Sequence, residues 1–123
     1  MAIQAICVCC GKPKTKVFGP CRACGFLPET EYQMARALIL SLTRTVGGLS
    51  VGRDASTLKA VAAQIQAGRF YEFDPREEQR AVAAWRAWSA ENERRRARRR
   101  SIAWTVLTLV LAAVAIAVAA HLT

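Results

Sequence analysis

The stretch that decides the fold reads RRRARRR from Arg94 to Arg100, then Ser101, then the uncharged run IAWTVLTLVLAAVAIAVAAHL from Ile102 to Leu122. At about 1.5 Å per residue, a helix of that length reaches roughly 30 Å, the thickness of the hydrocarbon core of a bilayer. Ten of the 21 residues in the run are Leu, Ile or Val, and seven are Ala. These residues favour the bilayer and no charge opposes them. We expect a transmembrane helix over residues 102–123.

The arginines before this run predict its orientation, because positive residues beside a span stay on the cytoplasmic side. We therefore expect a single-pass, tail-anchored protein of the cytoplasmic (inner) membrane, with the N-terminus in the cytoplasm. The same side chains are expected to contact anionic lipid headgroups. An arginine-rich helix can also bind nucleic acid, but here the adjoining span would hold it against the headgroups. The residues concerned are Arg94, Arg95, Arg96, Arg98, Arg99 and Arg100.

The net charge and the N-terminal residues limit the possible partners of the chain and the compartment in which its cysteines lie. The formal net charge is +9, and six of these charges lie in the arginine run, so the rest of the chain is only weakly basic. Residues 1–6 contain no basic leader and too short an apolar stretch for a secretory signal. We therefore expect the five cysteines to lie in a reducing compartment, where a dense cluster more often binds metal than forms disulfides.

Two copies of the pattern CxxCG carry the most specific chemical signal. They are Cys7-Val8-Cys9-Cys10-Gly11 and Cys21-Arg22-Ala23-Cys24-Gly25. Two cysteines three residues apart, followed by glycine, form a tight turn in which both thiolates converge on one ion. Four thiolates in a tetrahedron select zinc, with iron as the main rival.

These residues resemble the paired knuckles of the zinc-ribbon superfamily, over about twenty N-terminal residues. The resemblance implies a metal-bound hairpin module with one structural zinc, held by Cys7, Cys10, Cys21 and Cys24. The repeated Cys-Gly step favours Cys10 over Cys9, which is either an inert neighbour or a stand-in ligand. Rubredoxins use similar turns around a redox-active iron, but with a longer and more aromatic insert than the one here, whose only aromatic residue is Phe18.

The sequence shows no catalytic constellation. A catalytic zinc needs an open position or a non-cysteine ligand with a nearby base, and the only histidine is His121, at the far end of the expected span and across the membrane from the cysteines. We therefore do not expect an enzyme.

The middle of the chain predicts two helices. The first begins at a capping box made by Thr30 and Gln33, carries an apolar stripe from Ala35 to Val46, and ends at Gly47-Gly48. The second is capped by Asp54 or Ser56, has an apolar stripe from Leu58 to Ile65, and ends at Gly68. The two stripes are expected to pack on each other.

Asp74-Pro75 predicts the start of a third helix, and the absence of Gly and Pro from Arg76 to the end of the chain indicates one continuous helix, or two in register. Five aromatic residues in and before it are candidates for contact with a protein partner, because aromatics dominate interface hot spots. They are Phe70, Tyr71, Phe73, Trp85 and Trp88. The tryptophan stripe would otherwise pack on the two earlier helices or pair with another copy of the chain.

We expect a mainly α protein with four parts: a four-cysteine zinc ribbon (1–27), a two-helix head with an aromatic segment (28–73), a stalk helix with a polybasic end (74–101) and the span (102–123). The favoured function is a non-enzymatic adaptor or accessory subunit of a membrane complex. One alternative is a membrane-tethered ribbon that binds nucleic acid or the ribosome through Lys12, Lys14, Lys16 and Arg22. The other is a rubredoxin-like membrane-anchored electron carrier.

Overall fold

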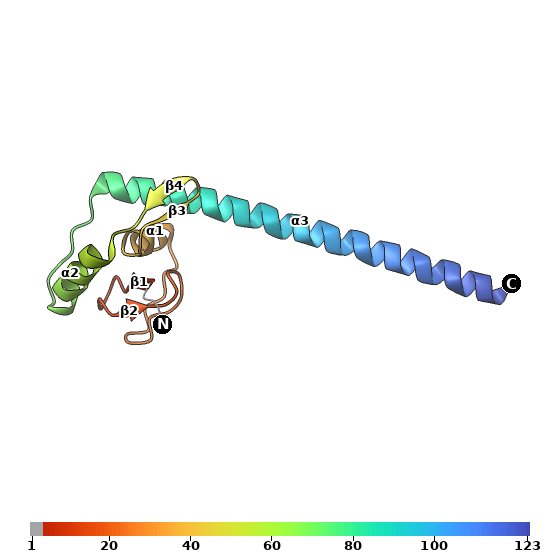
Figure 1. Ribbon diagram of the computed structural model, residues 1–123, viewed down its shortest axis with the longest axis horizontal. Coiled ribbons are helices and arrows are strands. Elements are labelled where there is room, and N and C mark those ends of the chain that lie inside the picture. The colour runs from red at the N-terminus through yellow and green to blue at the C-terminus, as the bar shows by residue number, and fades with distance from the viewer. Residues whose placement is uncertain (1–3) are drawn as a thin grey trace. The chain divides into compact units, whose positions relative to one another are not determined.

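The computed structural model describes residues 4–123. Residues 1–3 lie outside the described residues. They belong to the expected ribbon and to the N-terminal stretch in which we expect no secretory signal. The chain forms two compact units, the first ending at Trp88 and the second running from Ser89 to Thr123. Figure 1 shows the elements, which are predominantly helical, as the sequence predicts.

The N-terminal module is a short antiparallel hairpin of β1 (Ala5–Ile6) and β2 (Pro13–Lys14), in which Ala5 is paired with Lys14. The first CxxCG turn connects the two strands. The second turn follows at Cys21–Gly25, before the chain enters the first helix. Both cysteine turns therefore lie at the beginning of the first unit.

Helix α1 (Glu31–Ile39) begins at the predicted capping box. The backbone N–H of Gln33 donates to Thr30 Oγ1, and Gln33 Oε1 accepts from the backbone N–H of Thr30, each over 3.2 Å. The helix is shorter than predicted, because its C-cap is Leu40 and not a residue near Gly47. The expectation that the helical stripe continues to Val46 is wrong.

A second hairpin, which the sequence analysis missed, occupies the expected end of that helix. Strands β3 (Arg44–Val46) and β4 (Leu49–Val51) pair antiparallel, with Thr45 opposite Ser50. The turn is Gly47-Gly48, with φ of 56° and 79°. Two consecutive positive φ values suit the tight two-residue turn of a hairpin and are accessible to glycine at little cost.

Helix α2 (Ala55–Gln66) ends as predicted. Gly68 has φ of 78°, its N–H donates to the Ile65 carbonyl, and the N–H of Arg69 donates to the Gln64 carbonyl. This pair of bonds is a Schellman motif. At the other end, Asp54 is the N-cap by position, but its side chain accepts from the Ser56 hydroxyl and makes no capping bond to the backbone.

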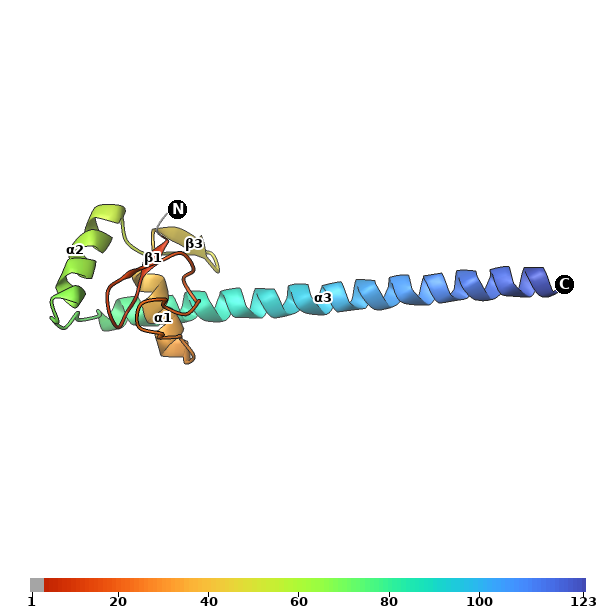
Figure 2. The same cartoon turned by 90° about the horizontal axis from the view of Figure 1, so that it is seen from below.

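Helix α3 (Pro75–Leu122) is a single helix, as the absence of Gly and Pro predicts. Its first turn is capped by Asp74, whose Oδ1 accepts from the backbone N–H of Arg76 over 3.1 Å. Within the first unit, α1 crosses the start of α3 (Figure 2), and two ion pairs link them. Glu31 pairs with Arg86, and Arg36 with Glu78.

The core of the first unit consists of two hydrophobic clusters. In the first, β1, α1, α2 and α3 meet around Ile6, Ile39, Leu58 and Val82. The apolar stripes of α1 and α2 therefore pack in one cluster, as expected, and β1 and α3 also contribute residues to it. In the second, Leu38 of α1 meets both hairpins and Ala84 of α3. The N-terminal module is thus part of a common core with the helices.

Candidate metal centre

The four predicted ligands come together at one point of the first unit. The Sγ atoms of Cys7, Cys10, Cys21 and Cys24 all lie within 4.8 Å of one another. The Sγ atoms of Cys7 and Cys24 are 3.6 Å apart, as are those of Cys10 and Cys21. Each close pair joins one turn to the other. The four cysteines can therefore hold a single metal ion between the two turns.

The two turns have the same backbone construction. The N–H of Gly11 donates to the Cys7 carbonyl over 2.9 Å, and the N–H of Gly25 donates to the Cys21 carbonyl over 2.8 Å. The N–H of the first cysteine in each turn donates to the carbonyl five residues later, of Lys12 or Phe26. Both glycines have positive φ, 73° and 78°, which a side chain would oppose. The repeated motif is therefore a repeated structure.

The turns also aim backbone donors at the sulfurs. Burial raises the pKa of the Cys7 thiol to about 12, although the N–H groups of Cys10 and Cys9 oppose this. Burial opposes ionisation of Cys21 as well, but the N–H groups of Cys24 and Ala23 and the neighbouring thiols outweigh it and lower the pKa of Cys21 to about 6. Backbone N–H groups thus favour ionisation in both turns, and a bound cation would favour the thiolate form of all four cysteines.

The arrangement fits a tetrahedral ion. With metal–sulfur bonds of about 2.3 Å, neighbouring sulfurs of a tetrahedron are roughly 3.8 Å apart, close to the 3.6 Å that separates Cys7 from Cys24 and Cys10 from Cys21. Cys9 is exposed and stands outside the group of four, which agrees with the preference for Cys10. The geometry shows a site that could hold a metal ion.

The comparisons with known proteins give no match, whether with a protein-family model, a curated protein or a solved structure. The likeness to zinc ribbons therefore rests on the two cysteine turns alone. Four cysteines at metal-binding distance are compatible with that fold.

The predicted basic edge of the ribbon is smaller than the sequence suggests. Lys14 is buried, with 7% of its surface exposed, and its Nζ donates to the Val17 carbonyl over 3.1 Å. Lys12, Lys16 and Arg22 are exposed. Lys14 therefore supports the loop between the two turns and does not contribute to a phosphate-binding surface.

The five predicted contact aromatics form two separate groups and a lone residue. Tyr71 and Phe73 pack edge to face at 4.9 Å against the first cluster, and Tyr71 OH accepts from Arg53. Trp85 and Trp88 pack against the second cluster. Phe70 alone is largely exposed, at 85%. The structure therefore does not gather these residues into one surface.

The expectation that the tryptophans pack on the earlier helices is only partly right, because both rings also pack against Phe18 of the N-terminal module. The Phe18 ring lies 4.9 Å from the Trp85 ring and 5.4 Å from the Trp88 ring. Phe18 is the only aromatic residue between the two turns, but its position in the sequence does not indicate which segment it packs against.

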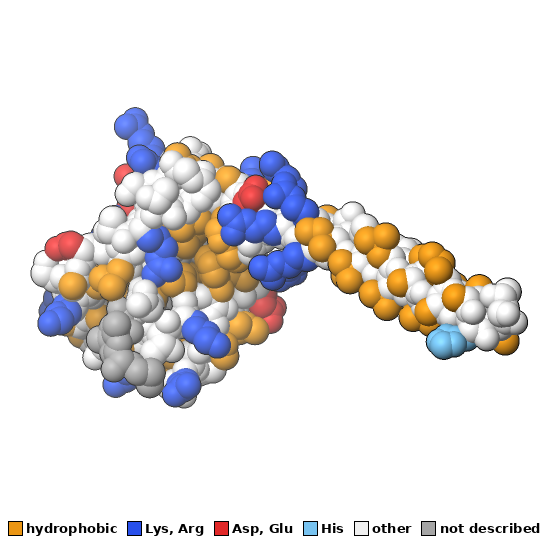
Figure 3. All heavy atoms as spheres, turned by 45° about the vertical axis from the view of Figure 1, so that its right-hand side comes forward, with side chains coloured by type: hydrophobic (Ala, Val, Ile, Leu, Met, Phe, Trp, Pro, Cys, Tyr) orange, Lys and Arg blue, Asp and Glu red, His pale blue; other side chains and the backbone are white. Residues whose placement is uncertain are grey.

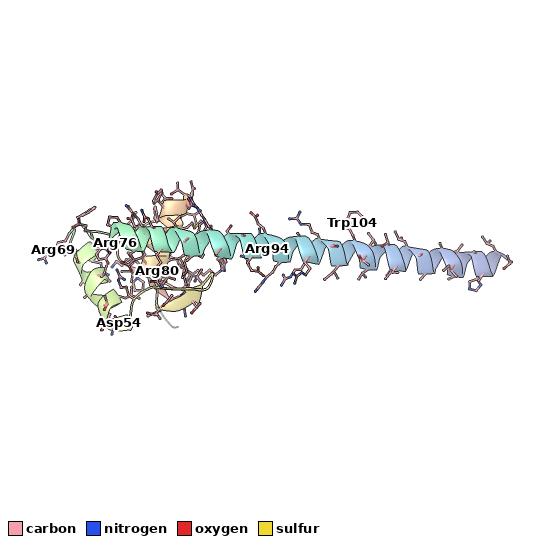
Figure 4. The ribbon with its side chains drawn as sticks, turned by 90° about the horizontal axis from the view of Figure 1, so that it is seen from above. Asp54, Arg69, Arg76, Arg80, Arg94 and Trp104 are labelled. Carbon is pink, nitrogen blue, oxygen red and sulfur yellow. The ribbon has the colours of Figure 1, made fainter. Side chains whose placement is uncertain are left out.

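The second unit contains the arginine run and the apolar run on consecutive turns of α3. Its most apolar window has a mean hydropathy of 2.5 and none of it is buried, so the helix is long and apolar enough to cross a membrane. Figure 3 shows the hydrophobic side chains of this segment and the basic side chains gathered before it. In Figure 4, Arg94 and Trp104 mark the basic and apolar parts of the helix.

Proposed function

We propose that this protein is a non-enzymatic, single-span membrane protein whose zinc-stabilised head holds a protein partner beside the bilayer on the cytoplasmic side. The observation that carries the proposal is the closed set of four sulfurs in a unit followed by an exposed apolar helix. A site filled by four cysteines leaves no open position for substrate or water, as is typical of structural zinc. The metal is then part of the fold of the head.

Zinc is the proposed occupant because four convergent thiolates match its preferred tetrahedral sulfur site. Binding of the ion would stabilise a module whose two hairpin strands are only two residues long each. The free energy of metal binding becomes free energy of folding in such modules. The ion also fixes the loop that carries Phe18 against α3.

The proposed mechanism is tethering. A span confines the head to a layer near the membrane and raises its effective concentration for any partner there. The six arginines before the apolar run support a cytoplasmic head through the positive-inside rule. They also favour anionic lipid, at roughly 1 kcal/mol per basic residue near the surface. Association with another copy of the chain is compatible with this role.

Purification of the full chain from membranes in mild detergent tests the metal and the partner together. We expect one zinc ion per chain, no visible absorbance and a stoichiometric membrane protein after crosslinking in intact cells. Iron with visible absorption would overturn the proposal and favour the alternative of a membrane-anchored electron carrier. Co-purification of RNA that dissociates at high salt, in place of a protein, would favour the nucleic-acid alternative. The burial of Lys14 weakens that alternative.

Protease protection tests the orientation. We expect protease to remove the head in inverted membrane vesicles and to spare it in intact spheroplasts. Replacement of the six arginines by glutamine should give a mixture of both orientations. Protection of the head of the unchanged protein in inverted vesicles would overturn the proposed orientation.

A further inference from the structure

A cleft of about 400 Å³ lies within the first unit, beside the loop that follows β2. Its floor is apolar and includes Leu38 of α1 and Val46 of β3, both buried. Phe18 and Trp88, each half-buried, form one wall. A hollow of this size and lining has room for the side chains of one or two residues of a bound segment.

The charged residues at this cleft are both positive. They are Lys16, which is exposed, and Arg44, which is half-buried. Arg44 donates to Gln4 Oε1 over 3.3 Å and to the Leu42 carbonyl over 3.4 Å, so neutral acceptors hold the side chain in place. Among residues 4–123, the five ion pairs involve neither Lys16 nor Arg44. The cleft therefore presents two cations without carboxylate partners beside an apolar floor.

The aromatic wall favours a peptide over a nucleic acid as the occupant. The ring of Phe18 packs against both Trp85 and Trp88, and the two tryptophan rings lie 5.1 Å apart. Phe18 and Trp88 are each half-buried in this packing, whereas the stacking of bases uses exposed aromatic faces. An apolar side chain flanked by carboxylates matches both the floor and the two cations.

We propose that this cleft binds an acidic segment of the protein partner. An apolar side chain of that segment contacts Phe18, Trp88 and Val46, and flanking carboxylates pair with Lys16 and Arg44. The inference rests on the proposed adaptor function and specifies the chemistry of its partner. It also assigns Lys16 and Arg44 to the recognition of that partner.

The experiment is a selection of random dodecapeptides on the full chain in nanodiscs of neutral lipid. Counter-selection on the Lys16→Glu/Arg44→Glu variant removes peptides that bind the arginine run. We expect the selected peptides to share a hydrophobic residue flanked by Asp or Glu. Fluorescence anisotropy should show affinity more than about tenfold weaker for the Lys16→Glu/Arg44→Glu variant. The matched control, Lys59→Glu/Arg69→Glu, makes the same change of charge outside the cleft and should bind like the unchanged protein.

A charge exchange separates recognition from loss of folding. A peptide with Lys in place of its acidic residues should bind the Lys16→Glu/Arg44→Glu variant better than the unchanged protein, which a misfolded head could not do. Three outcomes would overturn the inference: the selected peptides lack acidic residues, they bind both double variants equally, or the peptide with Lys does not bind the Lys16→Glu/Arg44→Glu variant better than the unchanged protein. If a crosslinked membrane partner still binds the Lys16→Glu/Arg44→Glu variant, the adaptor function stands and this site for it fails.

Discussion

Gly11 and Gly25 occupy equivalent positions in the two cysteine turns, with φ of 73° and 78°, but only Gly11 lies against another element. A Cβ atom on Gly11 would stand 2.8 Å from the Ala62 carbonyl oxygen of α2, whereas a Cβ on Gly25 would meet nothing within 4 Å. The Gly11 carbonyl also accepts from Gln66 Nε2 over 3.0 Å. The first turn is therefore docked on α2, while the second is open.

This difference predicts unequal effects of two identical substitutions. Gly25→Ala should cost about 1 kcal/mol, because alanine opposes the left-handed backbone. Gly11→Ala has the same penalty and a clash with backbone of α2, which together should cost about 2–4 kcal/mol. Thermal denaturation of the full chain in detergent, followed by tryptophan fluorescence, measures both. Equal losses would show that the first turn does not depend on its contact with α2.

The cysteine turns could be predicted from the sequence because their determinants are local. Ligand spacing and the following glycine specify each turn within five residues, so the four cysteines that come together are the four that the sequence predicts. The burial of Lys14 and the contact of Phe18 with the tryptophans could not be predicted, because segments distant in the sequence produce them.

The β3–β4 hairpin was missed although its signal is also local. Val46 fits both the apolar stripe of a helix and the alternation of a strand, and the helical interpretation treated Gly47-Gly48 only as a helix end. The alternation on both sides of a Gly-Gly pair is a strong hairpin pattern. Ser41 shows why the helix stops earlier: it is fully buried and forms a bridge with Ala5 of β1.

The metal centre predicts opposite outcomes for two neighbouring cysteines. Cys10→Ser removes one of the four converging sulfurs and should weaken metal binding by at least about 100-fold, since even changes behind the ligands cost roughly 10–100-fold. Cys9→Ser should leave one metal ion per chain, because Cys9 lies outside the group. Competition with a chromophoric chelator measures both affinities. Loss of metal from Cys9→Ser with retention in Cys10→Ser would reverse the ligand assignment.

Arg53 links β4, the aromatic segment and the start of α3. Its guanidinium binds the Glu77 carboxylate through two nitrogens and donates to Tyr71 OH over 3.1 Å. About a quarter of each charged side chain is exposed, at 25% and 27%. The hydrogen bonds that Arg53 donates to Glu77 and Tyr71 raise the pKa of Arg53 further above its usual value. Removal of Glu77 takes this contribution away, but Arg53 still stays charged in the partly buried site, because the ordinary pKa of arginine is itself far above neutral.

Glu77→Gln should accordingly destabilise the first unit by about 1–3 kcal/mol, because it leaves a partly buried guanidinium without its counter-charge. Glu72→Gln is the matched control: Glu72 is exposed and takes part in none of the ion pairs between described residues. Its expected effect is within about 0.5 kcal/mol. Denaturant unfolding at constant metal occupancy compares the two. A loss as small as that of the control would mean that the pair contributes no net stability.

The Glu31–Arg86 pair predicts how stability changes in acid. The hydrogen bond from the Arg86 guanidinium, with its charge, lowers the pKa of the Glu31 carboxyl in the folded protein. A depressed folded pKa gives stability that is present above the unfolded value, about 4.3 for Glu, and is lost as the pH falls through the folded pKa. The unchanged protein should therefore be more stable than Glu31→Gln near neutral pH, and the difference should shrink below about pH 4.3. Comparing the two proteins cancels any release of metal from the cysteine site in acid, because both proteins contain that site. The same comparison in an Arg86→Gln background should show a smaller dependence on pH, and an unchanged dependence there would assign the effect to the position of Glu31 in the first turn of α1.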